Sequence, residues 1–191
     1  MLISAILIMA GAYLAGSLNV SIILFALAGK GDPRSRFSGN AGTVNVWRQA
    51  GLGWAAAVLL LDMFRGVLLA LLAMHFLPMS LVPWAGFALI LGNRYPCFHR
   101  FQGGKGVAAY LGFSLPLTLP YGAVIACAAW AGTYALAKIP FISSFVMVTI
   151  LAIFTIIFLP ASVTAVAGVV ATLLFIYWNH GSNIRQLLVK K

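Results

Sequence analysis

Long apolar segments alternate with short polar segments along the chain. A membrane-spanning helix needs about 20 mainly apolar residues, and seven segments of the sequence approach this requirement. They cover residues 2–28, 51–76, 80–92, 106–119, 121–137, 142–159 and 161–178. Because the third and fourth are short, we expect them to tilt little or to end below the membrane surface. The pattern predicts an all-α integral membrane protein, a bundle of seven transmembrane helices forming a single polytopic domain over residues 1–191.

Composition agrees with this class of protein. The chain is 63% hydrophobic and 7% charged, with a mean hydropathy of +1.05, which excludes a soluble domain of this size. The first apolar segment has no basic residues before it and no small-residue cleavage site after it, so we interpret it as a retained span and not as a signal peptide. Cys97 and Cys127 are too few for a disulfide framework, and we expect two free thiols.

Positive charge is confined to one set of connections. Apart from Arg65, every Lys and Arg lies in the loops at about 29–50, 93–106 and 138–142 or in the tail 179–191. The connections at 76–80, 119–121 and 160–161 contain none. The positive-inside rule therefore predicts an external N-terminus, with the basic loops and the C-terminus in the cytoplasm. Topology and contact with anionic head groups or substrates explain the net charge of +10, so no nucleic-acid partner is expected.

The loop at residues 99–106 is rich in glycine and holds one lysine, Lys105. Gly103, Gly104 and Gly106 leave the backbone free to adopt positive φ angles, and successive N–H groups can then line a concave nest that binds anions. Lys105 adds a point charge suited to phosphate. A flexible turn with an interfacial lysine is an equally favoured alternative. The loop is not a Walker A motif, because Gly106 follows the lysine where Ser or Thr is required.

The loop at residues 32–48 is dense in hydroxyl, amide and small residues, with arginines near both ends. Such groups can surround an oxyanion, and arginine binds phosphate through two parallel hydrogen bonds. The alternative is an interfacial loop whose arginines contact lipid phosphates. We favour a binding site modestly, because two asparagines and two glycines within 39–45 are unusual for a simple connection.

Three further sets of polar residues allow two interpretations each. Asp62 and Arg65 lie three residues apart within a span, where a charge is costly unless it is paired. We favour a structural ion pair between them. The alternative is that one of the two side chains orients a site residue from behind. Ser143 and Ser144 either cap the sixth span or donate to a substrate oxygen, and capping is favoured. His180 and Asn183 would point the same way on a continuing helix, although a lone interfacial histidine is usually only solvated.

Carboxylates are nearly absent, and this limits the chemistry. Asp32 and Asp62 are the only two in the chain, so neither a pair of carboxylates for acid–base catalysis nor a cage for a hard metal ion is expected. No Ser–His–Asp set is indicated either. We predict no metal and no cofactor.

Together the loops resemble the bacterial acyl-phosphate:glycerol-3-phosphate acyltransferases, the PlsY family, over nearly the whole chain. Residues 38–48, with the pattern Ser-Gly-Asn-x-Gly-x-x-Asn-Val-x-Arg, resemble the first motif of the family. Residues 101–108, Phe-x-Gly-Gly-Lys-Gly-Val-Ala, are similar to the second motif and are the most specific match. Ser143-Ser144 and His180-x-x-Asn183-Ile184 resemble later motifs, and residues 61–66 resemble the family's Leu-Asp-x-x-Lys-Gly with Arg65 in place of Lys.

The resemblance implies transfer of a fatty acyl group from acyl phosphate to the 1-hydroxyl of glycerol 3-phosphate, giving lysophosphatidic acid for phospholipid synthesis. It implies catalytic roles for four residues: Arg48, Lys105, Ser144 and His180. It implies substrate binding by nine others: Ser38, Gly39, Asn40, Gly42, Asn45, Gly103, Gly104, Ser143 and Asn183. The chain would be a monomer in the lipid bilayer of the bacterial inner membrane, with its active site facing the cytoplasm.

Several positions depart from the family pattern. Asn93 stands where the family usually has His, Val44 where it has Thr, and Phe37 where it has Gly. One alternative is therefore a divergent paralogue that acylates another phosphorylated alcohol. A small anion transporter is a second alternative, although no inverted repeat is visible and polar residues avoid the centres of the spans. A non-catalytic membrane scaffold is a third.

Overall fold

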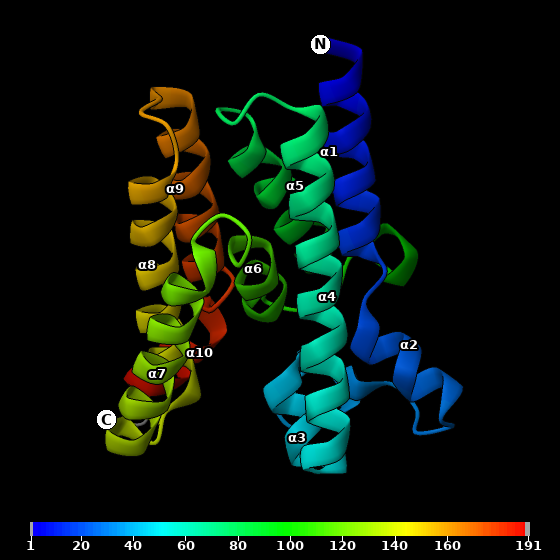
Figure 1. The fold of residues 1–191 in the computed structure, drawn as a ribbon. Coiled ribbons are helices and arrows are strands. Elements are labelled where there is room, and N and C mark those ends of the chain that lie inside the picture. The colour runs from blue at the N-terminus through cyan, green and yellow to red at the C-terminus, as the bar shows by residue number, and fades with distance from the viewer. Residues whose placement is uncertain (1, 190–191) are drawn as a thin grey trace.

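The structure, a computed structural model, describes residues 2–189, which form ten α-helices and two short 3-10 helices without a β-strand (Figure 1). The α-helices are α1 (Leu2–Ser17), α2 (Val20–Leu27), α3 (Thr43–Ala50), α4 (Leu52–Phe76), α5 (Val82–Arg94), α6 (Val107–Ser114), α7 (Leu119–Ala137), α8 (Pro140–Phe158), α9 (Val163–Trp178) and α10 (Gly181–Val189). The 3-10 helices are η1 (Pro33–Ser35) and η2 (Cys97–His99). The all-α prediction is confirmed for these residues. Lys190 and Lys191, counted among the tail cations, lie outside them.

Helix length supports fewer crossings than the seven predicted. Three described helices, α4, α7 and α8, are long and apolar enough to cross a membrane, and the bent pairs α1–α2 and α9–α10 raise the number to at most five. Helix α5 has 13 residues and α6 has 8. At about 1.5 Å per residue they span about 20 Å and about 12 Å, less than a hydrocarbon core of about 30 Å. The expectation of two short segments in the middle of the chain is thus met.

The first predicted span, residues 2–28, is broken and does not form one continuous helix. Helix α1 ends at Ser17 and α2 begins at Val20, with an angle of 43° between them. Asn19 causes the break: its side-chain Oδ1 accepts a hydrogen bond from Ile22 N at 3.3 Å and caps α2. Asparagine favours such caps over helix interiors because its amide competes with the backbone for hydrogen bonds.

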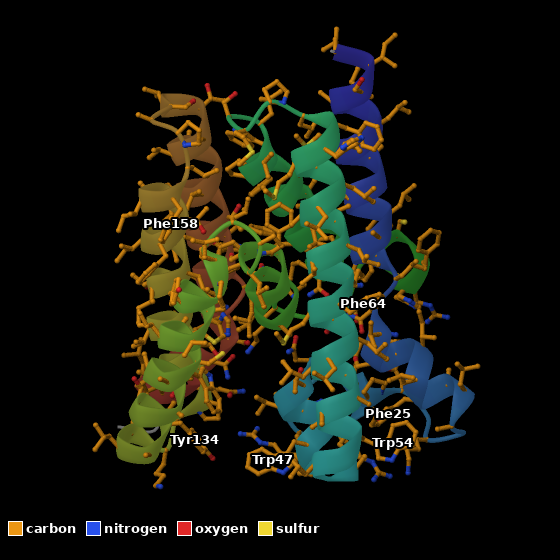
Figure 2. All side chains as sticks on the ribbon, viewed as in Figure 1. Phe25, Trp47, Trp54, Phe64, Tyr134 and Phe158 are labelled. Atoms are coloured by element: carbon orange, nitrogen blue, oxygen red, sulfur yellow. The ribbon has the colours of Figure 1, made fainter. Side chains whose placement is uncertain are left out.

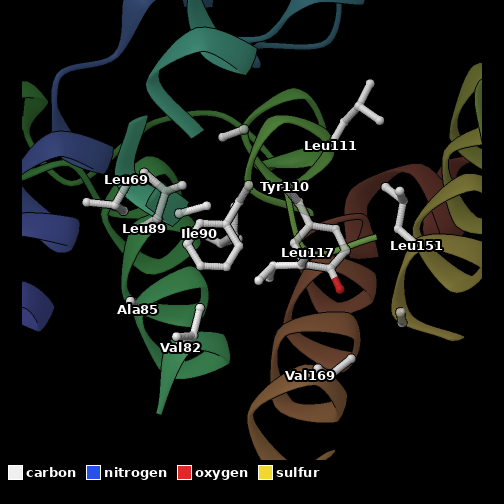
Figure 3. Packing of buried hydrophobic residues seen from close by; sticks show 14 of the residues in the cluster. Leu69, Val82, Ala85, Leu89, Ile90, Tyr110, Leu111, Leu117, Leu151 and Val169 are labelled. Carbon is white, nitrogen blue, oxygen red and sulfur yellow. The ribbon is translucent and has the colours of Figure 1, made fainter. Parts of the chain in front are cut away.

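The core is apolar and centres on α5 and α6. Leu89 and Ile90 of α5 pack beside Tyr110 of α6, and Leu151 of α8 and Val169 of α9 close the cluster from the other side (Figure 3). All five are buried. Helices α1 and α5 touch through their backbones: a Cβ added to Gly92 would lie 2.0 Å from Tyr13 O. Small residues allow such close contact in membrane bundles, where helix association depends on packing and not on exclusion of water.

Polar and charged groups gather at one end of the bundle. The N-terminus of the described chain lies at the opposite end from α2, α3 and α10 (Figure 1). Side-chain nitrogen atoms concentrate at the α3 end, where Trp47, Trp54 and Tyr134 also lie (Figure 2). Tryptophan and tyrosine favour the membrane–water interface. This end is where the basic loops meet.

Candidate active site

The glycine loop folds back onto the end of α5. Gly103 N donates to Arg94 O at 3.1 Å and Gly104 N donates to Asn93 O at 2.9 Å, while Ala41 N of the first loop donates to Gly103 O at 3.4 Å. The open nest expected at Gly103 and Gly104 is therefore wrong, because these two N–H groups already have acceptors. The N–H groups of Lys105 and Gly106, in contrast, donate to no acceptor within residues 2–189.

Close contact, more than conformational freedom, explains the two central glycines. Of the three glycines only Gly106 has a positive φ, of +87°. A Cβ on Gly103 would lie 2.1 Å from Asn93 O, and a Cβ on Gly104 would lie 2.7 Å from Ala41 O and 2.8 Å from Asn93 Nδ2. Any side chain at either position would push the loop away from α5 and from the first loop.

Lys105 is held between the loop and the tail. Its Nζ donates to Asn183 Oδ1 of α10, and its carbonyl accepts from Asn179 Nδ2 at 3.4 Å. Burial, together with the charges of Arg94 and Arg48, lowers the pKa of Lys105 to about 8. An anion bound here would reverse this effect, since opposite charge favours the protonated amine.

His180 lies at the bend between α9 and α10 and is 3% exposed. Its Nδ1 lies 2.8 Å from Ile176 O. Because a carbonyl only accepts, Nδ1 carries the proton and Nε2 keeps a lone pair. Burial, together with the charges of Lys105 and Arg94, lowers the pKa of His180 to about 4, and the hydrogen bond to Ile176 O opposes this shift. The neutral ring can accept a hydrogen bond at neutral pH.

The first loop is organised by its own amide side chains. Asn45, 2% exposed, donates from Nδ2 to Pro33 O at 2.8 Å and to Arg36 O at 3.3 Å, and its Oδ1 accepts from Ser38 N at 3.3 Å. Gly42 precedes α3, and a Cβ there would lie 2.9 Å from Asn40 Nδ2. Of the predicted binding residues in this loop, Asn45 thus acts on the shape of the loop, whereas Ser38 and Gly39 are exposed at its surface.

Arg34 joins the first loop to the glycine loop. Its Nη1 donates to His99 O at 2.8 Å and to Gln102 O at 2.7 Å. Asp32 holds the guanidinium with bonds of 2.6–3.0 Å, and the side-chain bond to Arg34 lowers the pKa of Asp32. Arg48, in the last turn of α3, is exposed, and its charge contributes to the lowered pKa of Lys105. The two loops predicted to form a site are therefore in contact.

Ser143 and Ser144 lie inside α8 and do not cap it. Ile139 occupies the cap position. Both serines are buried and donate to carbonyls four residues earlier, Ser143 to Ile139 O at 3.4 Å and Ser144 to Pro140 O at 3.0 Å. The capping interpretation is wrong, because Pro140 begins the helix ahead of them. The next residue, Phe145, packs against His180 with 5.1 Å between the ring centroids, so α8 borders the site.

The favoured ion pair of Asp62 and Arg65 is present, and Arg65 also donates hydrogen bonds to other helices. Arg65 Nη2 lies 2.6 Å from Asp62 Oδ1 and donates to Asn93 Oδ1 at 3.1 Å. Arg65 Nη1 donates to the carbonyls of Ala15 at 3.0 Å and Leu18 at the end of α1. Because the backbone O of Asn93 accepts a hydrogen bond from Gly104 N, Asn93 connects the Asp62–Arg65 ion pair to the glycine loop.

Arg94 is the site residue that the sequence did not single out. Sequence analysis gave it only as one of the cations of its loop. In the structure, the charge of Arg94 lowers the pKa values of Lys105 and His180. Its place immediately after Asn93, nine residues before the glycine pair, was the only signal. We call Lys105 with Arg48, Arg94 and His180 around it the basic cluster.

The basic cluster has no carboxylate to balance it. Both aspartates of the chain are bound elsewhere, Asp32 to Arg34 and Asp62 to Arg65, each at 2.6 Å. Buried or partly buried cations without a counter-charge are costly unless a ligand supplies one. The fold defines a helical membrane protein, and the basic cluster at one rim of its bundle is a candidate anion-binding site.

The chain matches the glycerol-3-phosphate acyltransferase family over residues 6–190. It belongs to that family. Curated relatives called glycerol-3-phosphate acyltransferase include one from Hydrogenovibrio crunogenus, 38% identical over 94% of this chain and 86% of the relative. Another, from Thioalkalivibrio sulfidiphilus, is 38% identical over 98% of this chain and 92% of the relative.

Solved structures agree with this assignment. The chain is similar to PlsY (YgiH), described as an integral membrane glycerol 3-phosphate acyltransferase, in its glycerol 3-phosphate form, with a TM-score of 0.88 and 29% identity over 98% of this chain and 93% of that one. The lysophosphatidic acid form gives a TM-score of 0.85 and 28% identity over the same shares. The predicted family is confirmed: this protein is a membrane acyltransferase of phospholipid synthesis.

Proposed function

We propose that the protein transfers a fatty acyl group from acyl phosphate to the 1-hydroxyl of glycerol 3-phosphate, giving lysophosphatidic acid and inorganic phosphate. The observation that carries this proposal is the basic cluster, which gathers positive charge from three parts of the chain beside the neutral His180, while both aspartates are paired elsewhere. Each substrate bears a phosphate, so the reaction needs positive charge more than it needs acids. PlsY structures in glycerol 3-phosphate and lysophosphatidic acid forms support this acceptor and this product.

Lys105, Arg48 and Asn183 bind the phosphate of glycerol 3-phosphate in this scheme. Lys105 and Asn183 are already bonded to each other, so the amide orients the amine before the substrate arrives. Ser38, Gly39 and the free N–H groups of residues 105–106 surround the acyl phosphate. Asn40, Gly42, Asn45, Gly103 and Gly104 keep these two loops in place, and Ser143 and Ser144 line the border formed by α8.

The chemical step needs little help beyond alignment, because acyl phosphate is a mixed anhydride with a good leaving group. The 1-hydroxyl oxygen attacks the acyl carbon, the bond from that carbon to the phosphate oxygen breaks, and inorganic phosphate leaves. His180 accepts a hydrogen bond from the hydroxyl at Nε2. The departing phosphate oxygen takes the proton of the hydroxyl as its bond to the acyl carbon breaks, and His180 orients the hydroxyl.

We infer seven membrane crossings, with the N-terminus outside and the site at the cytoplasmic face of the bacterial inner membrane. Besides α4, α7, α8 and the two bent pairs, α5 and α6 each reverse the direction of the chain (Figure 1). Their short lengths suit segments enclosed by neighbours, where backbone at membrane depth needs no contact with lipid. In this proposal the chain acts as one polytopic domain and as a monomer.

The test is acyl transfer by the purified protein in lipid nanodiscs. Palmitoyl phosphate and glycerol 3-phosphate should give lysophosphatidic acid and phosphate in equal amounts, measured by mass spectrometry and a phosphate assay. Lys105→Ala should lower the rate at least a hundredfold. Lys30→Ala, which removes a cation stacked 5.2 Å from the Trp54 ring, should keep the wild-type rate. Acylation of a different phosphorylated alcohol in place of glycerol 3-phosphate would overturn the acceptor, and anion flux without acyl product would overturn the reaction.

A further inference from the structure

Arg94 has features that set it apart from the other arginines near the site. It is the last residue of α5, and its carbonyl accepts from Gly103 N at 3.1 Å, so its backbone supports the glycine loop. The guanidinium carbon Cζ lies 5.3 Å from the centroid of the Tyr95 ring. Its Nε is buried and has no hydrogen-bond partner within residues 2–189. The side chain is therefore held beside the loop with a donor that nothing in the chain uses.

Arg34 and Arg65 provide the contrast. Each pairs with an aspartate at 2.6 Å and donates to backbone carbonyls of another segment. These are structural arginines, whose charge is balanced within the protein, although Arg65 Nε, like Arg94 Nε, has no hydrogen-bond partner within residues 2–189. Arg94 forms no ion pair within the described residues, and the chain has no third carboxylate to offer it. A guanidinium that is partly buried, unpaired and near the amine of Lys105 is stabilised by a ligand that is an anion.

We propose that the Arg94 guanidinium binds a phosphate group of one of the two substrates, as a third cation beside Lys105 and Arg48. The identity of these substrates rests on the proposed function, whereas the anion site itself does not. Phosphate fits the chemistry, because a guanidinium without an ion-pair partner can bind a phosphate group through parallel N–H hydrogen bonds. The charge count also fits. Two bound phosphates carry more negative charge than Lys105 and Arg48 neutralise, and a third cation reduces the repulsion between them.

The lowered pKa values of Lys105 and His180 agree with this arrangement, because the charge of Arg94 contributes to both. Removing that charge should raise the pKa of Lys105, and the pH above which its proton is lost should rise with it. A variant that only loosened the loop would also raise this pKa by exposing Lys105, since burial is its largest cause. Arg94→Lys keeps the positive charge and therefore separates the two effects: it should leave the pH dependence close to that of the wild type.

Kinetics of Arg94→Gln, Arg94→Lys and the control Arg100→Gln test the proposal in nanodiscs. Arg100 is an exposed cation of the same loop and carries no role in the site. The Michaelis constant KM is measured for each substrate with the other saturating. Arg94→Gln should raise KM for at least one substrate tenfold or more, Arg94→Lys should give a smaller rise, and Arg100→Gln should stay within twofold. A rise for glycerol 3-phosphate assigns Arg94 to the acceptor phosphate, and a rise for palmitoyl phosphate assigns it to the donor.

Binding of inorganic phosphate separates this proposal from the reaction. At constant ionic strength, phosphate should raise the unfolding temperature of the wild type and of Arg100→Gln, and Arg94→Gln should lose most of that rise. This result would stand even if the wild type transferred no acyl group. Equal stabilisation of Arg94→Gln by phosphate, no stabilisation of the wild type, or unchanged KM values with only a lower kcat would each overturn the role of Arg94.

Discussion

Lys105 is the residue on which the pH dependence of the site depends. Burial, with the charges of Arg94 and Arg48, lowers its pKa to about 8, so in the empty enzyme the amine loses its proton as the pH rises through 8. Bound phosphate favours the protonated form and raises this pKa again. Binding above pH 8 therefore takes up a proton, and binding must weaken as protons become scarce.

We predict that KM for glycerol 3-phosphate is constant below pH 8 and rises about tenfold per pH unit above it, since one proton is taken up. Initial rates between pH 6.5 and 9.5, corrected for spontaneous hydrolysis of palmitoyl phosphate, measure this. Lys105→Arg should abolish the alkaline rise, because a guanidinium keeps its proton throughout this range. A wild-type KM that stays flat to pH 9.5 would contradict the lowered pKa.

Gly104 gives a second prediction at the scale of single residues. A Cβ at this position would lie 2.7 Å from Ala41 O, a backbone atom that cannot simply rotate away. Gly104→Ala should cost about 1–3 kcal/mol of stability through overpacking and should reduce acyl transfer strongly. Gly132→Ala in α7 is the matched control, because a Cβ there has open space, and it should not destabilise the protein. Unfolding in detergent and transfer rates compare the two; equal behaviour would contradict the close contact.

Sequence indicated which residues belong to the site better than it indicated what they do there. The motif residues do meet, because Lys105 bonds to Asn183 and Gly103 bonds to Ala41. Their individual roles depend on partners that spacing cannot reveal. Asn45 is occupied by its own loop. Arg94 was overlooked, because its importance comes from both aspartates being paired elsewhere, and the sequence predicted only the pair of Asp62 with Arg65.

Among the helices, α4 connects the packing of the bundle to the site. Arg65 of α4 donates to carbonyls at the end of α1 and to the side chain of Asn93 at the end of α5. One side chain thus joins three helices at the depth where the first predicted span bends. The apolar pattern of residues 2–28 predicted one continuous span, because the residues on both sides of Asn19 are mainly apolar.

We predict that Arg65→Met costs about 3–5 kcal/mol of stability, because it leaves the buried Asp62 without its partner. Adding Asp62→Leu removes the unpaired charge and should restore most of this loss. Activity should not return, since Asn93 and the α1 carbonyls still lack their donor. Thermal unfolding in detergent and transfer rates of the single and double variants separate the two effects. Full recovery of activity in the double variant would show that the Asp62–Arg65 ion pair has a purely structural role.

At the scale of the whole molecule, the site exists only if all basic loops lie on one side of the membrane. Two observations favour this. The first loop and the glycine loop are bonded through Arg34, and the N-terminal end of α1 lies at the far end of the bundle from α3 (Figure 1). The direction of successive helices and the distribution of cations therefore lead to the same topology, although helix length alone does not.

Cysteine labelling tests this topology directly. Cys97 and Cys127 are first replaced by Ala, and single cysteines are then introduced at two positions in the basic loops, Ser35 and Arg100, and at two in the uncharged connections, Ser80 and Ala161. A membrane-impermeant maleimide should label Ser35→Cys and Arg100→Cys only in inside-out vesicles, because the positive-inside rule keeps basic loops in the cytoplasm. It should label Ser80→Cys and Ala161→Cys only in intact spheroplasts, and detergent should expose all four as a control. Labelling of Ser35→Cys and Arg100→Cys from opposite sides would separate Arg48 from Lys105 and exclude a shared phosphate site, whatever the transfer assay gave.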